Sequence, residues 1–193
     1  MRLKEKDLEI LFQLSERAFQ LQNKFIKKFN QKWNLRESCA ELGIQIGHLA
    51  QALIENNKIP TNKHSWQQYN RNLINNIADE LADCFLSICS IFHFAKITND
   101  EIEKFPPTVI IDNNYSKLLI ELHVLSMQLL DSAEVYDGLK PKFHRDERLL
   151  LLSSWRNLLH ILTYIVLQEK IDIIWKFKQM EESATKFLEG EVK

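Results

Sequence analysis

Residues 73–94 read LINNIADELADCFLSICSIFHF, and this stretch decides the fold. Its apolar residues recur at helical spacing and cover a wide arc: Leu73, Ile77, Leu81, Cys84, Phe85, Ile88, Ile91 and Phe92. We expect one helix here, from about Trp66 to Ala95. So wide an apolar arc is typical of the central helix of a bundle, because several neighbours must cover it.

Further helices are expected on both sides of this central one. Apolar periodicity predicts them at residues 4–29, 35–55, 116–136 and 145–189, the last interrupted near Lys170. A short helix follows Thr98 and stops at Pro106-Pro107, and we expect residues 108–114 to be a linker rather than a strand. Only 4 glycines and 4 prolines punctuate the chain, which favours long helices over a many-turned β fold. The predicted fold class is all-α.

Composition excludes several classes of protein. The chain has 193 residues, 45% hydrophobic and 26% charged, with a net charge of −1, so it lacks the basic excess typical of proteins that bind duplex nucleic acid. We expect no membrane partner, because no run of about 18 apolar residues is present and the N-terminus lacks the apolar core of a signal peptide. Three cysteines without a CxxC pair indicate a reducing, cytoplasmic location rather than a disulfide framework.

A weak internal repeat divides the chain. Residues 41–51 resemble residues 121–131 in pattern, and a strongly apolar helix follows each segment after a loop. This pattern predicts two related helical halves, residues 1–105 and a more divergent 106–193, packed as one unit. Shared helical periodicity alone also produces such a match, so both origins stay open.

The clearest chemical feature is the acidic pair Glu80 and Asp83. At a spacing of i, i+3 both carboxylates lie on one helix face, beside the apolar arc. Such a pair suits a hard cation such as Mg²⁺, which prefers oxygen ligands and also holds phosphates. The alternative is two solvated acids on a helix edge.

A second polar face accompanies this pair. Glu41, Gln45 and His48 stack at i, i+4 and i+7 on the helix expected at residues 35–55, offset from its apolar stripe. If this face meets Glu80 and Asp83, the pocket holds three carboxylates, an amide and an imidazole. If it does not, His48 is an ordinary surface histidine.

Residues 47–53 read GHLAQAL and residues 79–83 read DELAD. Together they resemble the MazG-type all-α NTP pyrophosphatase superfamily, in which an EExxE motif on one helix and ExxD on another bind Mg²⁺. That ion holds a nucleoside triphosphate for cleavage between the α and β phosphates. The resemblance covers about residues 33–104 and implies a MazG-like bundle; because the superfamily commonly builds its bundles from subunits, it is also compatible with a homodimer.

The resemblance also implies roles for individual residues. Glu80 and Asp83 are the expected ligands of Mg²⁺ or Mn²⁺, and Glu41, Gln45 and His48 complete the catalytic pocket. Trp33 and Lys96 are nucleotide-binding candidates by position alone.

The first acidic motif departs from the family pattern. Ile44, Gln45 and His48 stand where the family has its three acids, and two carboxylates are unlikely to support a multi-metal site. Two functions follow: a divergent NTP pyrophosphohydrolase with weak or lost activity, or a non-catalytic module that binds a nucleotide or a protein partner. An unrelated bundle is a third possibility. The discriminating feature is whether Glu80 and Asp83 face Gln45 and His48 across a cleft.

Basic and aromatic residues also alternate between positions 24 and 36. They are Lys24, Phe25, Lys27, Lys28, Phe29, Lys32, Trp33 and Arg36. Such a segment can bind phosphates or stack a base, or it can be the solvated basic face of an amphipathic helix.

Overall fold

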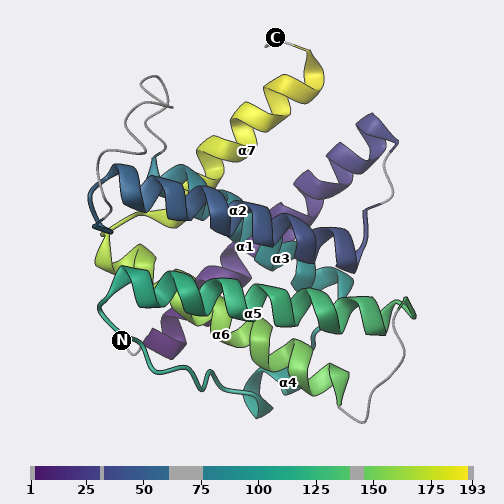
Figure 1. The fold of residues 1–193 in the computed structure, drawn as a ribbon. Coiled ribbons are helices and arrows are strands. Elements are labelled where there is room, and N and C mark those ends of the chain that lie inside the picture. Colours follow the sequence, from purple (N-terminus) through teal and green to yellow (C-terminus); the bar gives the residue numbers. More distant parts are fainter. Residues whose placement is uncertain (1–2, 31–32, 61–75, 140–145, 191–193) are drawn as a thin grey trace.

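The computed structural model describes residues 3–30, 33–60, 76–139 and 146–190, and all regular secondary structure within them is helical (Figure 1). The helices are α1 (Leu3–Phe29), α2 (Leu35–Glu55), α3 (Ile77–Phe94), α4 (Asn99–Lys104), α5 (Tyr115–Tyr136), α6 (Glu147–Gln168) and α7 (Ile173–Glu189). The predicted all-α class is confirmed.

Most helix ends lie where the sequence predicts them, because short polar side chains cap them. Asn34 accepts hydrogen bonds from two backbone amides at the start of α2, and Thr98 forms a capping box with Glu101 at α4. The predicted break near Lys170 separates α6 from α7, and Lys170 has a positive φ of 53°. Residues 108–114 form neither helix nor strand, as expected of a linker.

The prediction of one continuous helix from about Trp66 to Ala95 is wrong, because α3 begins only after residue 76. Asn76 has an extended backbone, and its side chain accepts a hydrogen bond from the Ala78 amide, so α3 begins at Ile77. The proposed starting residue, Trp66, lies outside the described residues.

Helix α3 occupies the centre of the molecule, as its wide apolar arc predicts. It packs against α1, α2, α6 and α7, while α5 packs against α2 and α6. The Trp155 indole of α6 is fully buried and donates a hydrogen bond to the Ile88 carbonyl of α3. Helices from both sides of residue 105 therefore contribute to one continuous core.

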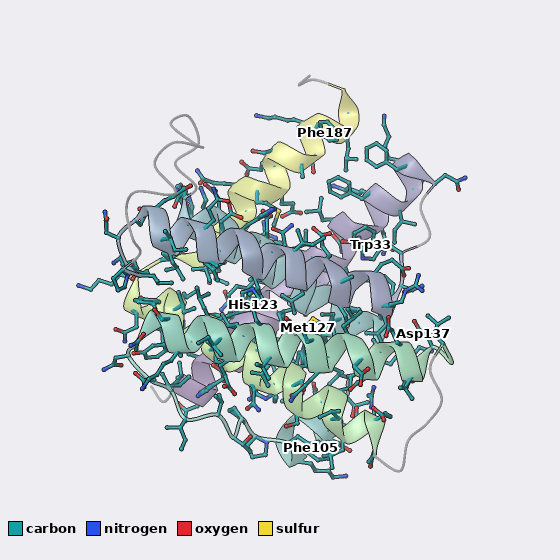
Figure 2. The ribbon with its side chains drawn as sticks, viewed as in Figure 1. Trp33, Phe105, His123, Met127, Asp137 and Phe187 are labelled. Carbon is teal, nitrogen blue, oxygen red and sulfur yellow. The ribbon has the colours of Figure 1, made fainter. Side chains whose placement is uncertain are left out.

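The pair α2 and α5 runs antiparallel across one face of the molecule. Trp33, just before α2, lies at the same end as Asp137, just after α5 (Figure 2). This direction places the start of α2 beside the end of α5.

Helix α6 is long and apolar enough to cross a membrane by length and composition alone, which the sequence reading did not anticipate. In the fold, 78% of its most apolar window is buried against other helices. Its apolar character therefore has an explanation in the core of the bundle.

Candidate functional site

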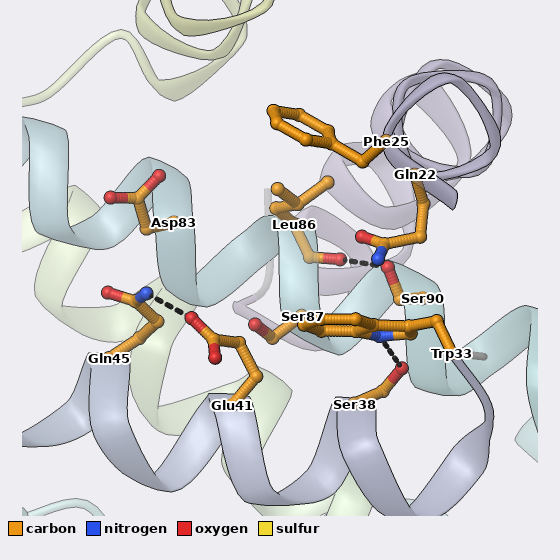
Figure 3. A pocket seen from close by; sticks show the side chains of 10 residues that line it. All are labelled: Gln22, Phe25, Trp33, Ser38, Glu41, Gln45, Asp83, Leu86, Ser87 and Ser90. Carbon is orange, nitrogen blue, oxygen red and sulfur yellow. Dashed lines mark hydrogen bonds between the residues drawn. The ribbon is translucent and has the colours of Figure 1, made fainter. Parts of the chain in front are cut away.

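A cleft of about 180 Å³ lies between α1, α2 and α3 (Figure 3). The residues lining it come from all three helices and the segment before α2: Gln22, Phe25, Trp33, Ser38, Glu41, Gln45, Asp83, Leu86, Ser87 and Ser90. Sequence reasoning had singled out Trp33, Glu41, Gln45 and Asp83 among them.

On the α2 side, three polar side chains form a chain of hydrogen bonds. Gln45 Nε2 donates to Glu41 Oε1 over 2.6 Å, so the other end of the amide, Oε1, faces His48. The distance from that Oε1 to His48 Nδ1 is 3.2 Å. Because an amide oxygen only accepts, this contact is a hydrogen bond when His48 carries a proton on Nδ1.

The α3 side brings the acidic pair against this chain. His48 Nδ1 lies 3.8 Å from Glu80 Oε2, and Asp83 faces Gln45 across the cleft (Figure 3). The structure thus brings the polar face of α2 beside the acidic pair of α3, but of these four residues only Gln45 and Asp83 line the cleft, while His48 and Glu80 lie outside its lining. It also favours a shared pocket over two solvated acids on a helix edge.

The acidic pair carries a charge conflict. Burial first, and then the neighbouring carboxylates of Glu80, Asp79 and Glu41, together raise the pKa of Asp83 to about 6, against an opposing effect of His48. Burial also raises the pKa of Glu80, which His48 partly offsets. These carboxylates are close enough to repel each other, and a bound cation would relieve that repulsion.

The donor set limits which metal the cleft can hold. Among the residues that the structure describes, no three His, Cys, Asp or Glu side chains converge as a metal-binding group. Two carboxylates still fit Mg²⁺, because proteins commonly bind that ion through one or two carboxylates plus the phosphates of the substrate. Glu80 and Asp83 therefore fit an ion that arrives with a triphosphate, but not a resident metal centre.

The opposite end of the cleft is aromatic and polar. Trp33 Nε1 donates to Ser38 Oγ over 2.9 Å, which fixes the indole at the entrance to α2. Phe25 and Gln22 reach the cleft from α1, and Ser87 and Ser90 from α3 (Figure 3). Ser87 shares the helix face of Glu80 and Asp83 by its spacing, but sequence reasoning missed Gln22, because Gln22 lies on another helix and only tertiary packing brings it here.

Lys96 does not line the cleft. It is exposed just beyond the C-terminus of α3, and its proposed role in nucleotide binding stays a prediction. The basic residues Lys24, Lys27 and Lys28 are exposed as well, which favours the solvated basic face, and Lys32 lies outside the described residues.

Comparison with protein-family models, curated proteins and solved structures found no match. The chemistry of the site therefore has to be judged from its own geometry.

Proposed function

We propose that the chain is a divergent MazG-like nucleoside triphosphate pyrophosphohydrolase, built from two related helical halves. The supporting observation is that the polar face of α2 meets the acidic pair of α3: Gln45 and Asp83 line one cleft, and His48 lies 3.8 Å from Glu80 beside it. If the ExxD motif were accidental and the bundle unrelated to the family, nothing would require the acidic pair of α3 to lie beside Gln45 and His48. The substrate is a nucleoside triphosphate, and the products are the monophosphate and pyrophosphate.

Glu80 and Asp83 would hold Mg²⁺ or Mn²⁺ brought by the triphosphate, and the ion would offset charge on the phosphates. The α2 residues supply the proton chemistry. Glu41 orients the Gln45 amide, and this amide holds the Nδ1 proton of His48. His48 Nε2 is then free to take a proton from the water that attacks the phosphorus.

Pyrophosphate release from a panel of canonical and modified NTPs tests this function, with Mg²⁺ and Mn²⁺ in parallel. The Glu80→Ala, Asp83→Ala double variant is the blank. Asp79→Ala is the matched control, because Asp79 lies on the same helix but is paired with Lys176 at 2.5 Å. Release that the blank abolishes and the control retains supports the proposal. Equal release by the blank and the parent contradicts it.

A specific observation favours a second function, a non-catalytic nucleotide-binding module. Gln45 and His48 occupy the positions of two family acids, and the described residues contain no group of three metal ligands. This alternative predicts that Mg²⁺-nucleotide binds, but that no pyrophosphate forms with either metal. Calorimetric titration with a nucleotide that also serves in the release assay separates the two functions.

A further inference from the structure

The aromatic end of the cleft has an unusual charge for a nucleotide pocket. Phe25 and Trp33 line it together with the Glu41 carboxylate, and no Lys or Arg is among the described residues that line the cleft. Only one oxygen of Glu41 is engaged, in the bond from Gln45 Nε2. Negative charge beside aromatic faces favours a positively charged planar group, through cation–π attraction and charge-assisted hydrogen bonds.

Two polar side chains line this end of the cleft beside the aromatic rings. Gln22 is 6% exposed and Ser87 is 5% exposed, and both belong to the cleft wall. An amide and a hydroxyl in a cavity wall supply donors and acceptors for the polar edge of a ligand.

The order of residues along the two helices separates this end from the acidic pair. Ser38, Glu41, Gln45 and His48 follow one another along α2, while Glu80, Asp83, Ser87 and Ser90 run the opposite way along α3. Ser87 lies seven positions after Glu80, about 10 Å of helical rise. Phosphates and their ion at Glu80 and Asp83 therefore leave the base at Glu41 and Trp33.

We propose that this end selects nucleotides whose base carries a positive charge, the class represented by 7-methylguanine. The rings of Trp33 and Phe25 face the charged heterocycle, and the free oxygen of Glu41 accepts its N–H groups. The Gln22 amide hydrogen-bonds a remaining edge. This inference rests on the proposed function for the placement of the phosphates, but it concerns the base alone.

Calorimetric titration in slightly acidic buffer compares 7-methylguanosine with guanosine, and their triphosphates in the presence of Mg²⁺. We expect the methylated member of each pair to bind at least about tenfold more tightly. In Glu41→Gln the affinity ratio falls toward one. Glu37→Gln keeps the ratio, because Glu37 lies one turn away and pairs with Arg36.

Each outcome separates the two proposals. Equal affinities within both pairs in the parent protein overturn the base preference and leave the pyrophosphohydrolase proposal standing. A preference for 7-methylguanosine without pyrophosphate release supports the base preference and contradicts the enzyme. A ratio unchanged in Glu41→Gln, in a variant that unfolds at the parent's temperature, overturns the role of Glu41.

Discussion

At the residue scale, the ionised carboxylate of Asp83 destabilises the folded protein, because it is largely buried beside other carboxylates. Its pKa is raised to about 6, above the value of about 3.9 for an unfolded chain. The native state therefore binds the proton more tightly. Ionised Asp83 lowers the free energy of unfolding above pH 6, and this penalty disappears below about pH 4.

Asp83→Asn should raise the free energy of unfolding at neutral pH. We expect a gain of about 1–2 kcal/mol, reduced from the full shift because the carboxylate is partly solvated. Urea unfolding at several pH values measures this gain, which should shrink as the pH falls from 7 toward 4. Asp79→Asn should gain less than Asp83→Asn, because Asp79 is half exposed, adds only part of the charge that raises the pKa of Asp83, and is paired with Lys176. A gain in the free energy of unfolding of Asp83→Asn that does not depend on pH would contradict the conclusion that the ionised Asp83 carboxylate is destabilising.

Restoring acids on α2 should strengthen metal binding. Gln45→Glu with His48→Glu places carboxylates opposite Glu80 and Asp83, where the family carries them. Four carboxylates can hold Mg²⁺ or Mn²⁺ without a nucleotide, so we expect the double variant to bind Mn²⁺ at least about tenfold more tightly than the parent. Titration of free Mn²⁺ by electron paramagnetic resonance measures it. No change would mean that the two helices do not form one metal pocket.

At the element scale, Arg148 ties three helices together. Its guanidinium bonds both Glu101 oxygens of α4 at 2.8 Å and also donates to the Ala95 and Lys96 carbonyls at the end of α3. The hydrogen bonds and charge of Arg148, together with hydrogen bonds from Thr98, lower the pKa of Glu101 to about 2. The contribution of this pair is therefore present above the unfolded pKa of Glu101 and is lost as the pH falls toward 2.

Arg148→Ala should lower the free energy of unfolding by about 1–2 kcal/mol, because it removes a two-pronged pair and two caps on α3 carbonyls. Arg148→Lys should recover less than half of the loss, since an ammonium cannot reproduce the fork. Denaturant unfolding near neutral pH measures both variants. If Arg148→Lys recovered the full free energy of unfolding, the positive charge alone would stabilise this contact, and the role of the guanidinium fork would be contradicted.

The same scale shows where sequence reasoning succeeds. Caps at Asn34 and Thr98 and the break near Lys170 could be read directly, because they depend on residues within one turn of each other. The start of α3 could not be read from the sequence. The apolar pattern extends back to Leu73, but the Asn76 side chain caps the helix, which therefore begins at Ile77. The Arg148 tie also escapes the sequence, because 47 residues separate Arg148 from Glu101.

The candidate site divides in the same way. Spacing along α2 and α3 predicted which acids and amides share a face, and these residues do meet. Lys96 was assigned by position alone, without a periodicity to place it, and it does not line the cleft. Ser87 follows from spacing, since it lies one turn after Asp83, whereas Gln22 enters through the packing of α1 on α3, which local spacing does not encode.

At the scale of the whole molecule, a buried ionic joint connects α1 to α6. The Asp7 carboxylate lies 2.7 Å from His160 Nδ1 and 3.5 Å from Arg156 Nη1, and all three side chains are buried. One Asp7 oxygen and Arg156 Nε have no hydrogen-bond partner. The joint links the N-terminal helix to the second half of the chain.

Asp7→Asn should lower the free energy of unfolding by about 3–5 kcal/mol, because it leaves the Arg156 charge buried without an opposite charge. Glu9→Gln is the control, since Glu9 pairs with Lys6 near the surface and should cost under about 1 kcal/mol. Denaturant unfolding followed by fluorescence and circular dichroism should give coincident single transitions for the parent. Two separate transitions would contradict one shared core.

The most direct test of the central claim is a crystal structure with a non-hydrolysable triphosphate analogue and Mn²⁺. The α2–α3 cleft should hold the analogue, with the anomalous signal of manganese beside Glu80 and Asp83 and the base beside Trp33. Manganese and analogue bound elsewhere, or a cleft filled by its own side chains at saturating analogue, would contradict the claim that this cleft binds nucleoside triphosphates.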